Sequence, residues 1–405
     1  MAKFKIGVLH ETKVPKDRRA ALTPNTAKKF VDKFDNVEVV VQTSDLRAFK
    51  NDEYTKNNIP IVEDVSDCDL LMGVKEVNIE KLIPNKTYMF FAHIAKMQEH
   101  NKPLIKALID KKITIIDYEY LTDEFERRIV AFGFWAGIVG AYNGIRAWAK
   151  RTGEYELKPA HEYHDKREMF DTISKIRFKK PFRIVITGGG RVASGAEETL
   201  EAFGIKQVIP EEYLTEQYDY PVFTRLDPCH YVRHKNGFEF DLHHFFKHPE
   251  EYVSTFKVYT KMTDMYIAAH FWNPKSPRFF TAEDTKREDF TIKVVSDISC
   301  DVDNGPVGST IRATTIDEPF YDFNPISGKE EKAFSSENNI TVMSVDNLPG
   351  ELPRDASEDF SSILIEKVLP NFFNDDKKGI IERATILKEG NLTERFAYLK
   401  DWIKS

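Results

Sequence analysis

Cysteine is scarce in this 405-residue sequence, and its three cysteines are scattered. Cys68, Cys229 and Cys300 form no C-x-x-C pair, so the sequence predicts neither a disulfide framework nor a cysteine-ligated zinc site. Unpaired thiols of this kind are typical of a reducing compartment, and we expect a cytoplasmic protein.

Long apolar runs and a basic excess are absent as well. No stretch approaches the roughly 20 apolar residues that span a membrane, and the apolar run within residues 1–9 is too short for a signal peptide. The net charge is −7, from 58 basic and 65 acidic residues, which argues against nucleic acid as a partner. We expect a globular protein of about two domains that binds neither membrane nor nucleic acid.

Five histidines lie between residues 230 and 248 without forming a metal-binding motif. None has the H-E-x-x-H spacing of a zinc site, and aromatic residues surround them. The sequence therefore predicts no metal ion.

A glycine-rich turn is the most informative single motif. Residues 183–186 predict a buried strand, and residues 193–203 predict a helix. Between them Gly188, Gly190 and Ala193 fit the G-x-G-x-x-G/A pattern, in which small residues permit a tight turn and close approach of a pyrophosphate. The first N–H groups of the helix also favour phosphate. This pattern predicts a bound dinucleotide, NAD or NADP.

The choice between these two coenzymes depends on residues that follow the helix. Glu211 lies 21 residues past Gly190, near the spacing at which an acidic residue holds a ribose 2′-hydroxyl, which favours NAD. Pro210 shortens the preceding strand, and Arg191 and Arg225 could hold a 2′-phosphate instead. A solvent-facing role for Glu211 also stays open.

Polar side chains follow four predicted strands in the N-terminal third. Strands alternating with helices predict a parallel sheet covered on both faces. Ligands bind at the carboxyl edge of such sheets. Any one of these polar residues could be a solvated loop residue. Four of them that each follow a strand end together predict a ligand-binding site. They are Lys13, Lys75, His93 and Glu119, after strands near residues 5–9, 69–74, 86–92 and 113–119.

Helix signals place the domain boundaries. Thr23 is expected to cap a helix that begins at Pro24. Small residues at helical spacing over 136–150 predict a crossover helix that packs closely on a neighbour, and the polar stretch 151–180 predicts a surface helix. Pro353 can start a helix over residues 354–369. We expect a substrate domain of residues 1–135 plus 353–405 and a dinucleotide-binding domain of residues 136–352.

Several longer stretches resemble one family, over residues 6 to about 372. Glu11-Thr-Lys13 and Arg19-Ala-Ala-Leu-Thr-Pro24 are similar to the opening of the alanine dehydrogenase and transhydrogenase superfamily. More specific stretches resemble lysine-forming saccharopine dehydrogenase, at residues 73–76, 91–96, 131–137, 297–301 and 344–354. Residues 246–256, with Trp272 and Pro277-Arg278, resemble the lysine–ketoglutarate reductase domain of the bifunctional animal and plant enzyme.

The resemblance implies two Rossmann-like α/β domains with parallel sheets and an active site in the cleft between them. It implies an oxidoreductase that interconverts saccharopine with L-lysine and 2-oxoglutarate using NAD(P)(H), by imine formation and hydride transfer. It is compatible with a homo-oligomer.

Residue roles follow from the same resemblance. Lys75 and His93 would be the acid–base pair, with Glu76 and Glu119 tuning them, and like charge would lower the pKa of Lys75. The implied substrate contacts are Lys13, Arg19, Lys96, Arg128 and Phe132. The implied cofactor contacts, besides the glycines and Glu211, are Arg191, Val192, Asp346 and Leu348.

Two alternatives stay open at this point. The first is alanine dehydrogenase, or another reductase of the superfamily that joins a different amine to a different keto acid. The second is a non-catalytic dinucleotide-binding module.

Overall fold

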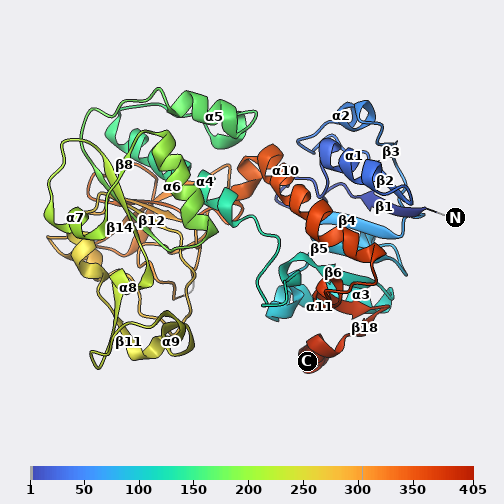
Figure 1. Cartoon of the computed structure of the whole chain (residues 1–405). Helices are drawn as coiled ribbons and strands as arrows, with labels where there is room; N and C mark the ends of the chain where they lie inside the picture. The colour runs from blue at the N-terminus through green and yellow to red at the C-terminus, as the bar shows by residue number, and fades with distance from the viewer. Residues whose placement is uncertain (1–2, 303) are drawn as a thin grey trace. The chain divides into compact units, whose positions relative to one another are not determined.

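Two separate eight-stranded sheets organise the chain, of which the computed structural model describes residues 3–302 and 304–405. Unit 1 consists of Met1–Phe132 together with Pro353–Ser405, and unit 2 consists of Gly133–Leu352. The chain therefore builds most of unit 1, then all of unit 2, and returns to complete unit 1 (Figure 1).

The sheet of unit 1 is parallel except at one edge. Its strand order is β18-β17-β6-β5-β4-β1-β2-β3, and only the pairings of β17 with β6 and with β18 are antiparallel. The strands are β1 (Phe4–Val8), β2 (Val37–Gln42), β3 (Ile61–Val62), β4 (Leu70–Lys75), β5 (Thr87–Phe91), β6 (Thr114–Asp117), β17 (Thr385–Lys388) and β18 (Asn391–Leu392). The central strands are runs of buried apolar side chains, as expected where helices cover both faces.

The helices of unit 1 come from both ends of the chain. In Figure 1, α10 from the C-terminal segment lies beside α1, and Ser357 of α10 accepts a 2.9 Å hydrogen bond from the Ala20 backbone. Thr23 caps α1 and Pro24 is its first residue, which confirms the predicted helix start. The helices are α1 (Pro24–Lys33), α2 (Asn51–Lys56), α3 (Lys102–Asp110), α10 (Pro353–Ile363), α11 (Ile380–Ala384) and α12 (Lys400–Lys404).

The sheet of unit 2 has a parallel centre and an antiparallel edge. Its order is β15-β14-β16-β13-β12-β7-β9-β8, with β14 antiparallel to both neighbours. The strands are β7 (Arg183–Thr187), β8 (Lys206–Gln207), β9 (Val222–Leu226), β12 (Met265–Ala268), β13 (Val294–Asp297), β14 (Phe320–Asn324), β15 (Lys329–Glu331) and β16 (Ile340–Met343). A separate hairpin pairs β10 (Val232–His234) with β11 (Tyr252–Ser254).

Helix α4 (Gly133–Thr152) is the long helix of unit 2, and it packs against α6 (Arg191–Ala202). A Cβ atom on Gly137 would overlap the Val192 carbonyl, and one on Gly195 would overlap the Phe134 carbonyl. Close packing through small residues, predicted from their spacing, is therefore confirmed. The expected surface helix over 151–180 is shorter, because only α5 (Lys166–Ile173) forms there. The remaining helices are α7 (Pro210–Thr215), α8 (Pro228–Tyr231) and α9 (Leu242–Lys247).

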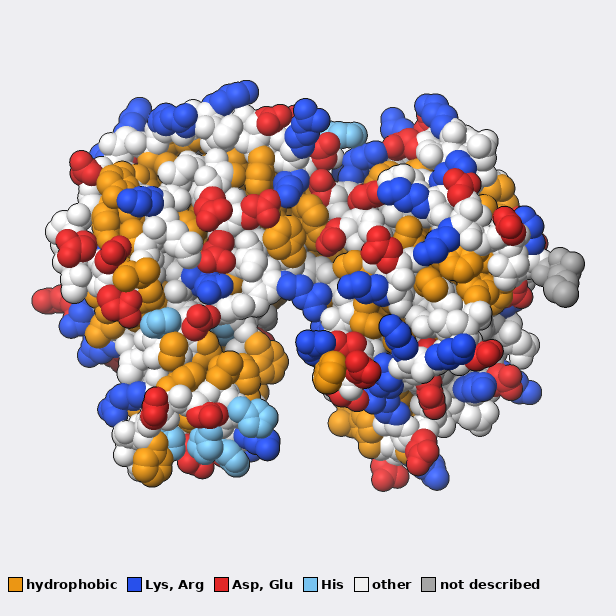
Figure 2. All heavy atoms as spheres, in the orientation of Figure 1, with side chains coloured by type: hydrophobic (Ala, Val, Ile, Leu, Met, Phe, Trp, Pro, Cys, Tyr) orange, Lys and Arg blue, Asp and Glu red, His pale blue; other side chains and the backbone are white. Residues whose placement is uncertain are grey.

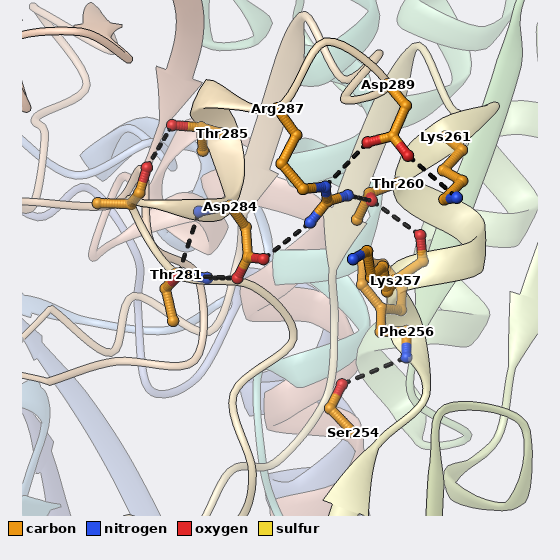
Figure 3. Close-up of polar contacts among 11 residues, drawn as sticks. Ser254, Phe256, Lys257, Thr260, Lys261, Thr281, Asp284, Thr285, Arg287 and Asp289 are labelled. Carbon is orange, nitrogen blue, oxygen red and sulfur yellow. Dashed lines mark hydrogen bonds and ion pairs between the residues drawn. The ribbon is translucent and has the colours of Figure 1, made fainter.

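Side-chain hydrogen bonds hold the irregular segment around residues 254–289 (Figure 3). The Arg287 guanidinium donates to Asp284 (2.8 Å), Asp289 (2.9 Å) and the Thr260 hydroxyl (2.7 Å). Lys261 forms a second ion pair with Asp289 at 3.0 Å. The contacts of Arg287 with Thr260 and of Lys261 with Asp289 join the segment before β12 (Met265–Ala268) to the segment after it.

The predicted α/β class with two largely parallel sheets is confirmed. No helix in the described ranges is long and apolar enough to cross a membrane.

Candidate functional site

Neighbouring parallel strands of unit 1 end at one edge of the sheet. Lys75, the last residue of β4, pairs in register with Phe91 of β5, and Phe90 pairs with Asp117 at the end of β6. His93 and Glu119 follow two residues after Phe91 and Asp117. The polar side chains predicted at separate strand ends therefore follow adjacent strands at the same edge of the sheet.

Glu119 joins three cationic or basic side chains at this edge. Its carboxylate lies 3.2 Å from His93 Nδ1, 3.1 Å from Lys96 Nζ and 3.9 Å from Arg128. Burial by itself would raise the pKa of Glu119, but these three neighbours outweigh it and lower the pKa to about 2. An ionised Glu119 can only accept hydrogen bonds, so His93 donates from Nδ1, and in the neutral imidazole its Nε2 carries the lone pair.

A buried carboxylate, that of Asp117, fixes the two loops that carry His93 and Glu119. It accepts backbone N–H bonds from His93 (3.2 Å) and Glu119 (2.9 Å). His93 has the left-handed backbone conformation, with φ of 54°, which is uncommon for a residue other than glycine. Burial raises the pKa of Asp117 to about 6. Asp117 therefore determines the relative placement of the imidazole and its partner.

Lys75 differs from the other cations of the cluster in having no acidic partner. No carboxylate in the described part of the chain lies within ion-pairing distance of its Nζ. The pKa of Lys75 is lowered, first by burial and then by the charge of Arg19. The direction agrees with the expectation from like charge, but loss of water is the larger cause.

Glu11 holds the end of β4 that carries Lys75. Its two oxygens accept the backbone N–H groups of Val74 (2.6 Å) and Lys75 (2.9 Å). Burial raises the pKa of Glu11 to about 7, although these two bonds oppose the shift. The carboxyl thus positions the backbone of the candidate acid–base lysine.

Arg19 is buried beside Lys75 and is rigidly held. Its Nε and Nη2 atoms donate to the two oxygens of Asp17 at 3.0 and 2.6 Å, and its guanidinium carbon lies 4.3 Å from the centre of the Phe132 ring. Phe132 stacks in turn on Phe360, with ring centroids 4.6 Å apart. Despite burial, the Arg19 guanidinium holds the pKa of Asp17 well below its usual range.

Lys13 and Glu76, predicted respectively as a substrate contact and a tuning group, form an ion pair with each other. Among the named cations of this cluster, Lys13, Arg19, Lys96 and Arg128 thus each face a carboxylate, and Lys75 alone does not.

The glycine-rich turn lies at the carboxyl end of β7 in unit 2. Gly188 has φ of 116°, and a Cβ there would lie 2.5 Å from the Ala269 carbonyl oxygen. At Gly190, which precedes the first residue of α6, an added Cβ would meet nothing within 4 Å. The turn is therefore strained for any other residue at Gly188, and it leaves open space at Gly190 where α6 begins.

The acidic residue beside this turn is Asp227, not Glu211. Glu211 is exposed in the first turn of α7, after the two-residue edge strand β8. The strand that neighbours β7 is β9, and Asp227 follows its last residue. A Cβ on Gly189 would lie 2.5 Å from an Asp227 oxygen. Arg225 pairs with Glu197 (3.5 Å) and Asp227 (3.7 Å).

The other predicted cofactor contacts lie at element ends of unit 2. Arg191 and Val192 are the first two residues of α6. Asp346 is exposed beyond β16, whereas Leu348 is buried near Gly140 of α4, where an added Cβ would lie 3.4 Å from the leucine side chain.

Sequence reasoning missed four carboxylates that shape the site: Glu11, Asp17, Asp117 and Asp227. Asp117 could have been suspected because it ends a predicted strand two residues before Glu119. The roles of the other three depend on which elements become neighbours in space.

Known proteins resemble this chain over nearly its full length. Residues 7–139 match the family described as alanine dehydrogenase/PNT, N-terminal domain. The mitochondrial alpha-aminoadipic semialdehyde synthase of Rattus norvegicus is 28% identical, and the match covers 95% of this chain and 46% of that protein. The saccharopine dehydrogenase [NAD(+), L-lysine-forming] of Yarrowia lipolytica is also 28% identical, covering 91% and 92%. The chain spans about half the length of the semialdehyde synthases that it matches.

Solved structures show the same fold. An L-alanine dehydrogenase superposes with a TM-score of 0.67 at 16% identity, covering 99% of both chains. A transhydrogenase from Sinorhizobium meliloti superposes with a TM-score of 0.57 at 13% identity. The chain is therefore similar in sequence to lysine-forming saccharopine dehydrogenases and to alpha-aminoadipic semialdehyde synthases, and it shares the fold of alanine dehydrogenase and transhydrogenase.

Proposed function

We propose that this chain is an NAD-dependent oxidoreductase that interconverts saccharopine with L-lysine and 2-oxoglutarate. The observation that carries the proposal is Lys75: a partly buried lysine with a lowered pKa and no acidic partner among the described residues, at the same sheet edge as His93. The named activity of the Yarrowia lipolytica relative supports the choice of substrates. We also propose that the two units correspond to a substrate domain and a dinucleotide-binding domain.

The residues of unit 2 fit a dinucleotide. The open space at Gly190 and the N-terminus of α6 suit a pyrophosphate, as do the nearby Arg191 and Val192. We assign the ribose 2′-hydroxyl to Asp227, since this carboxylate lies beside the glycine turn and would repel a 2′-phosphate. The nicotinamide ring, when bound, supplies the hydride acceptor or donor. Asp227 therefore favours NAD over NADP.

The substrates bring three carboxylates, and unit 1 offers a matching set of cations. Lys13, Lys96 and Arg128 are partly exposed, whereas Arg19 is buried against Asp17. The acidic partners of these cations keep them in place and reduce the net positive charge before substrate arrives. A substrate carboxylate can then share or displace such a partner, and arginine binds it with two parallel hydrogen bonds.

Proton transfer is the task of Lys75 and His93. The ε-amine of L-lysine has an ordinary pKa near 10.4 and must lose its proton before it attacks the ketone of 2-oxoglutarate. The carbinolamine that forms then loses water to give an imine, which needs a proton on the departing hydroxyl. Lys75 with its lowered pKa and the free Nε2 of His93 can accept and return these protons.

The first test is an assay of the purified chain. We expect oxidation of NADH in the presence of both L-lysine and 2-oxoglutarate, with saccharopine as product, and a higher kcat/KM with NADH than with NADPH. Activity only with pyruvate and ammonia would instead indicate alanine dehydrogenase. Tight NADH binding without turnover of any amine and keto-acid pair would indicate a non-catalytic module.

The acid–base assignment predicts the effect of two substitutions. Lys75→Met and His93→Gln should each lower kcat by about 100-fold or more, the usual contribution of a general acid or base. Lys33→Met, at an exposed lysine in the last turn of α1, is the matched control and should leave kcat unchanged. Wild-type rates at neutral pH in both active-site variants would remove these residues from the mechanism.

A further inference from the structure

The histidine-rich segment of unit 2 folds into a compact group that the proposed reaction does not use. Strand β10, the loop before β11 and helix α9 bring His234, His244 and Glu251 together, with one potential ligand atom from each within 4.8 Å of the others. His248 follows one helical turn after His244, and their ring centroids are 5.0 Å apart. Figure 2 shows histidine side chains gathered at this end of unit 2, over α9 and β11 as labelled in Figure 1.

The hydrogen bonds of His244 determine which of its nitrogens is available. The Tyr252 hydroxyl donates to the Asp241 carbonyl at 3.4 Å, so it accepts the 3.2 Å bond from His244 Nδ1. His244 Nε2 then carries the lone pair, and it lies 3.9 Å from an oxygen of Glu251. In the neutral imidazole this nitrogen and the carboxylate both present electron pairs to the same space, where a metal cation would be attracted to both.

His234 has a different role from His244, because its proton is on the other ring nitrogen. Its Nδ1 accepts the Asn236 backbone N–H at 3.1 Å, so the proton is on Nε2, which donates to Glu251 at 3.2 Å. His234 is only 3% exposed and belongs to the fold of the hairpin. It orients the carboxylate, as groups hydrogen-bonded to metal ligands commonly do.

His244 and Glu251 already face one another, and His248 lies close enough to His244 to join them by rotating away from Glu250, which its Nδ1 approaches to 3.9 Å. His244, His248 and Glu251 are 41%, 48% and 47% exposed, so an ion can reach them and small rotations can close the remaining gaps. His244 and His248 line a cavity of about 480 Å³. Zinc bonds of about 2.0–2.2 Å to imidazole nitrogen and carboxylate oxygen suit this donor set, with water completing the shell.

We propose that His244, His248 and Glu251 bind a divalent transition-metal ion of the zinc type, with His234 as a positioning residue for Glu251. His244 and His248 have the i, i+4 spacing of one helical turn, and Glu251 follows three residues later at the end of a 3-10 turn, so the pattern differs from H-E-x-x-H by the place of its carboxylate.

The test uses the full chain without a histidine tag, stripped with a chelator and dialysed. Co²⁺ is titrated while visible absorption is recorded, and Zn²⁺ affinity is measured by calorimetry. We expect one ion per chain, and at least about 10-fold weaker Zn²⁺ binding in each of His244→Ala, His248→Ala and Glu251→Gln. His234→Phe should weaken binding by about 10-fold or more through Glu251 while leaving the position of the Co²⁺ band unchanged. His164→Ala, an exposed histidine outside the cluster, should have no effect.

Several outcomes would overturn the proposal. These are an absence of Co²⁺ absorption in the wild-type chain up to about 1 mM metal, equal affinity in wild type and His244→Ala, or equal weakening by His164→Ala. A shifted Co²⁺ band in His234→Phe would make His234 a ligand and overturn its assigned role. All variants keep the glycine turn and the unit 1 cluster, so failure of metal binding leaves the proposed oxidoreductase function untouched.

Discussion

At the scale of single residues, buried carboxylates hold the backbone of the candidate acid–base residues. Glu11 and Asp117 each accept two backbone N–H bonds at strand ends, and burial raises the pKa of both. Burying a carboxylate removes its hydrating water, which is unfavourable. Hydrogen bonds from backbone N–H groups that would otherwise lack a partner offset this cost. Here the satisfied donors belong to Lys75, His93 and their neighbours.

Asp117→Asn tests this positioning role. The asparagine amide has one oxygen, so its NH₂ group would face one of the two backbone donors, and one hydrogen bond would be lost at a cost of about 1–3 kcal/mol. We expect kcat to fall about 10-fold or more, with an altered pH–rate profile because the His93–Glu119 pair moves. Steady-state kinetics between pH 6 and 9 measures this.

Asp123→Asn is the control for Asp117, because both backbone N–H bonds to Asp123, from Phe125 and Arg127, end on the same oxygen and an asparagine can keep them. Its kinetics should match wild type. If Asp117→Asn lowers the melting temperature but leaves kcat and the pH profile as in wild type, Asp117 has a structural role only.

The raised pKa of Glu11 predicts how the free energy of unfolding changes with pH. Its pKa is about 7 in the folded chain against an ordinary 4.5, so the folded state binds more protons between these values. The free energy of unfolding should therefore fall as pH rises from about 4.5 to about 7, by at most about 1.4 kcal/mol per pH unit from this group. Glu11→Gln should remove that contribution, so its stability relative to wild type should increase over this window and level off above it.

Urea denaturation of wild type and Glu11→Gln at pH 5, 6 and 7.5 measures the difference. Glu80→Gln, at an exposed carboxylate on the same unit, should run parallel to wild type. Parallel curves for Glu11→Gln as well would show that the carboxyl is not protonated in the folded state near neutral pH.

At the scale of secondary-structure elements, the turn between β7 and α6 contains two glycines that are needed for different reasons. Gly188 is required by the fold, because its φ is positive and the Ala269 carbonyl occupies the space of a side chain. Gly190 has open space around it and φ of −100°, which any residue can adopt. The fold does not require a glycine there, which agrees with the close approach of a pyrophosphate that we propose.

Gly190→Ala should therefore weaken dinucleotide binding without loss of stability. We expect the melting temperature of the unliganded chain to stay within about 1 °C of wild type, since a surface change away from strain has little effect. The dissociation constant for NADH should rise at least about 10-fold, because the added methyl group would meet the pyrophosphate. Fluorescence titration with NADH measures this change.

Gly188→Ala is the comparison, and it should lower the melting temperature as well as the affinity. Unchanged NADH affinity in Gly190→Ala would contradict the placement of the pyrophosphate at this turn.

At the scale of the whole molecule, unit 1 is discontinuous in sequence and unit 2 is not. The segment after Leu352 adds β17 to the sheet beside β6 and places Phe360, Leu364 and Leu369 in the unit 1 core. Each such side chain contributes about 1.5–3 kcal/mol on burial, which in sum is comparable to the total stability of a domain, about 5–15 kcal/mol.

A chain that ends at Leu352 should therefore keep unit 2 folded and lose unit 1. Hydrogen–deuterium exchange should show protection of β7 and β12 near the full-length level, with β5 and β6 exchanging rapidly. A chain that ends at Leu399 is the control, because it lacks only α12, none of whose residues is buried. Full protection of β6 in the chain ending at Leu352 would contradict the dependence of unit 1 on its returning segment.

The sequence alone determined features that depend on near neighbours in the chain. The helix start at Thr23 and Pro24, the turn from β7 into α6, and the polar residues after β4 and β5 were all predicted, because capping, glycine geometry and apolar runs act over a few residues. The direction of the Lys75 pKa shift agrees with the expectation from the cations that the family resemblance places around it, although burial is its main cause.

Only the tertiary structure decided which elements become neighbours. β9 rather than β8 lies beside β7, which brings Asp227 and not Glu211 to the glycine turn. Glu11 reaches the end of β4 across 63 residues of chain, and His234 meets Glu251 because β10 and β11 form a hairpin. Contacts of this kind depend on strand order and packing, which the spacing of residues along the chain does not specify.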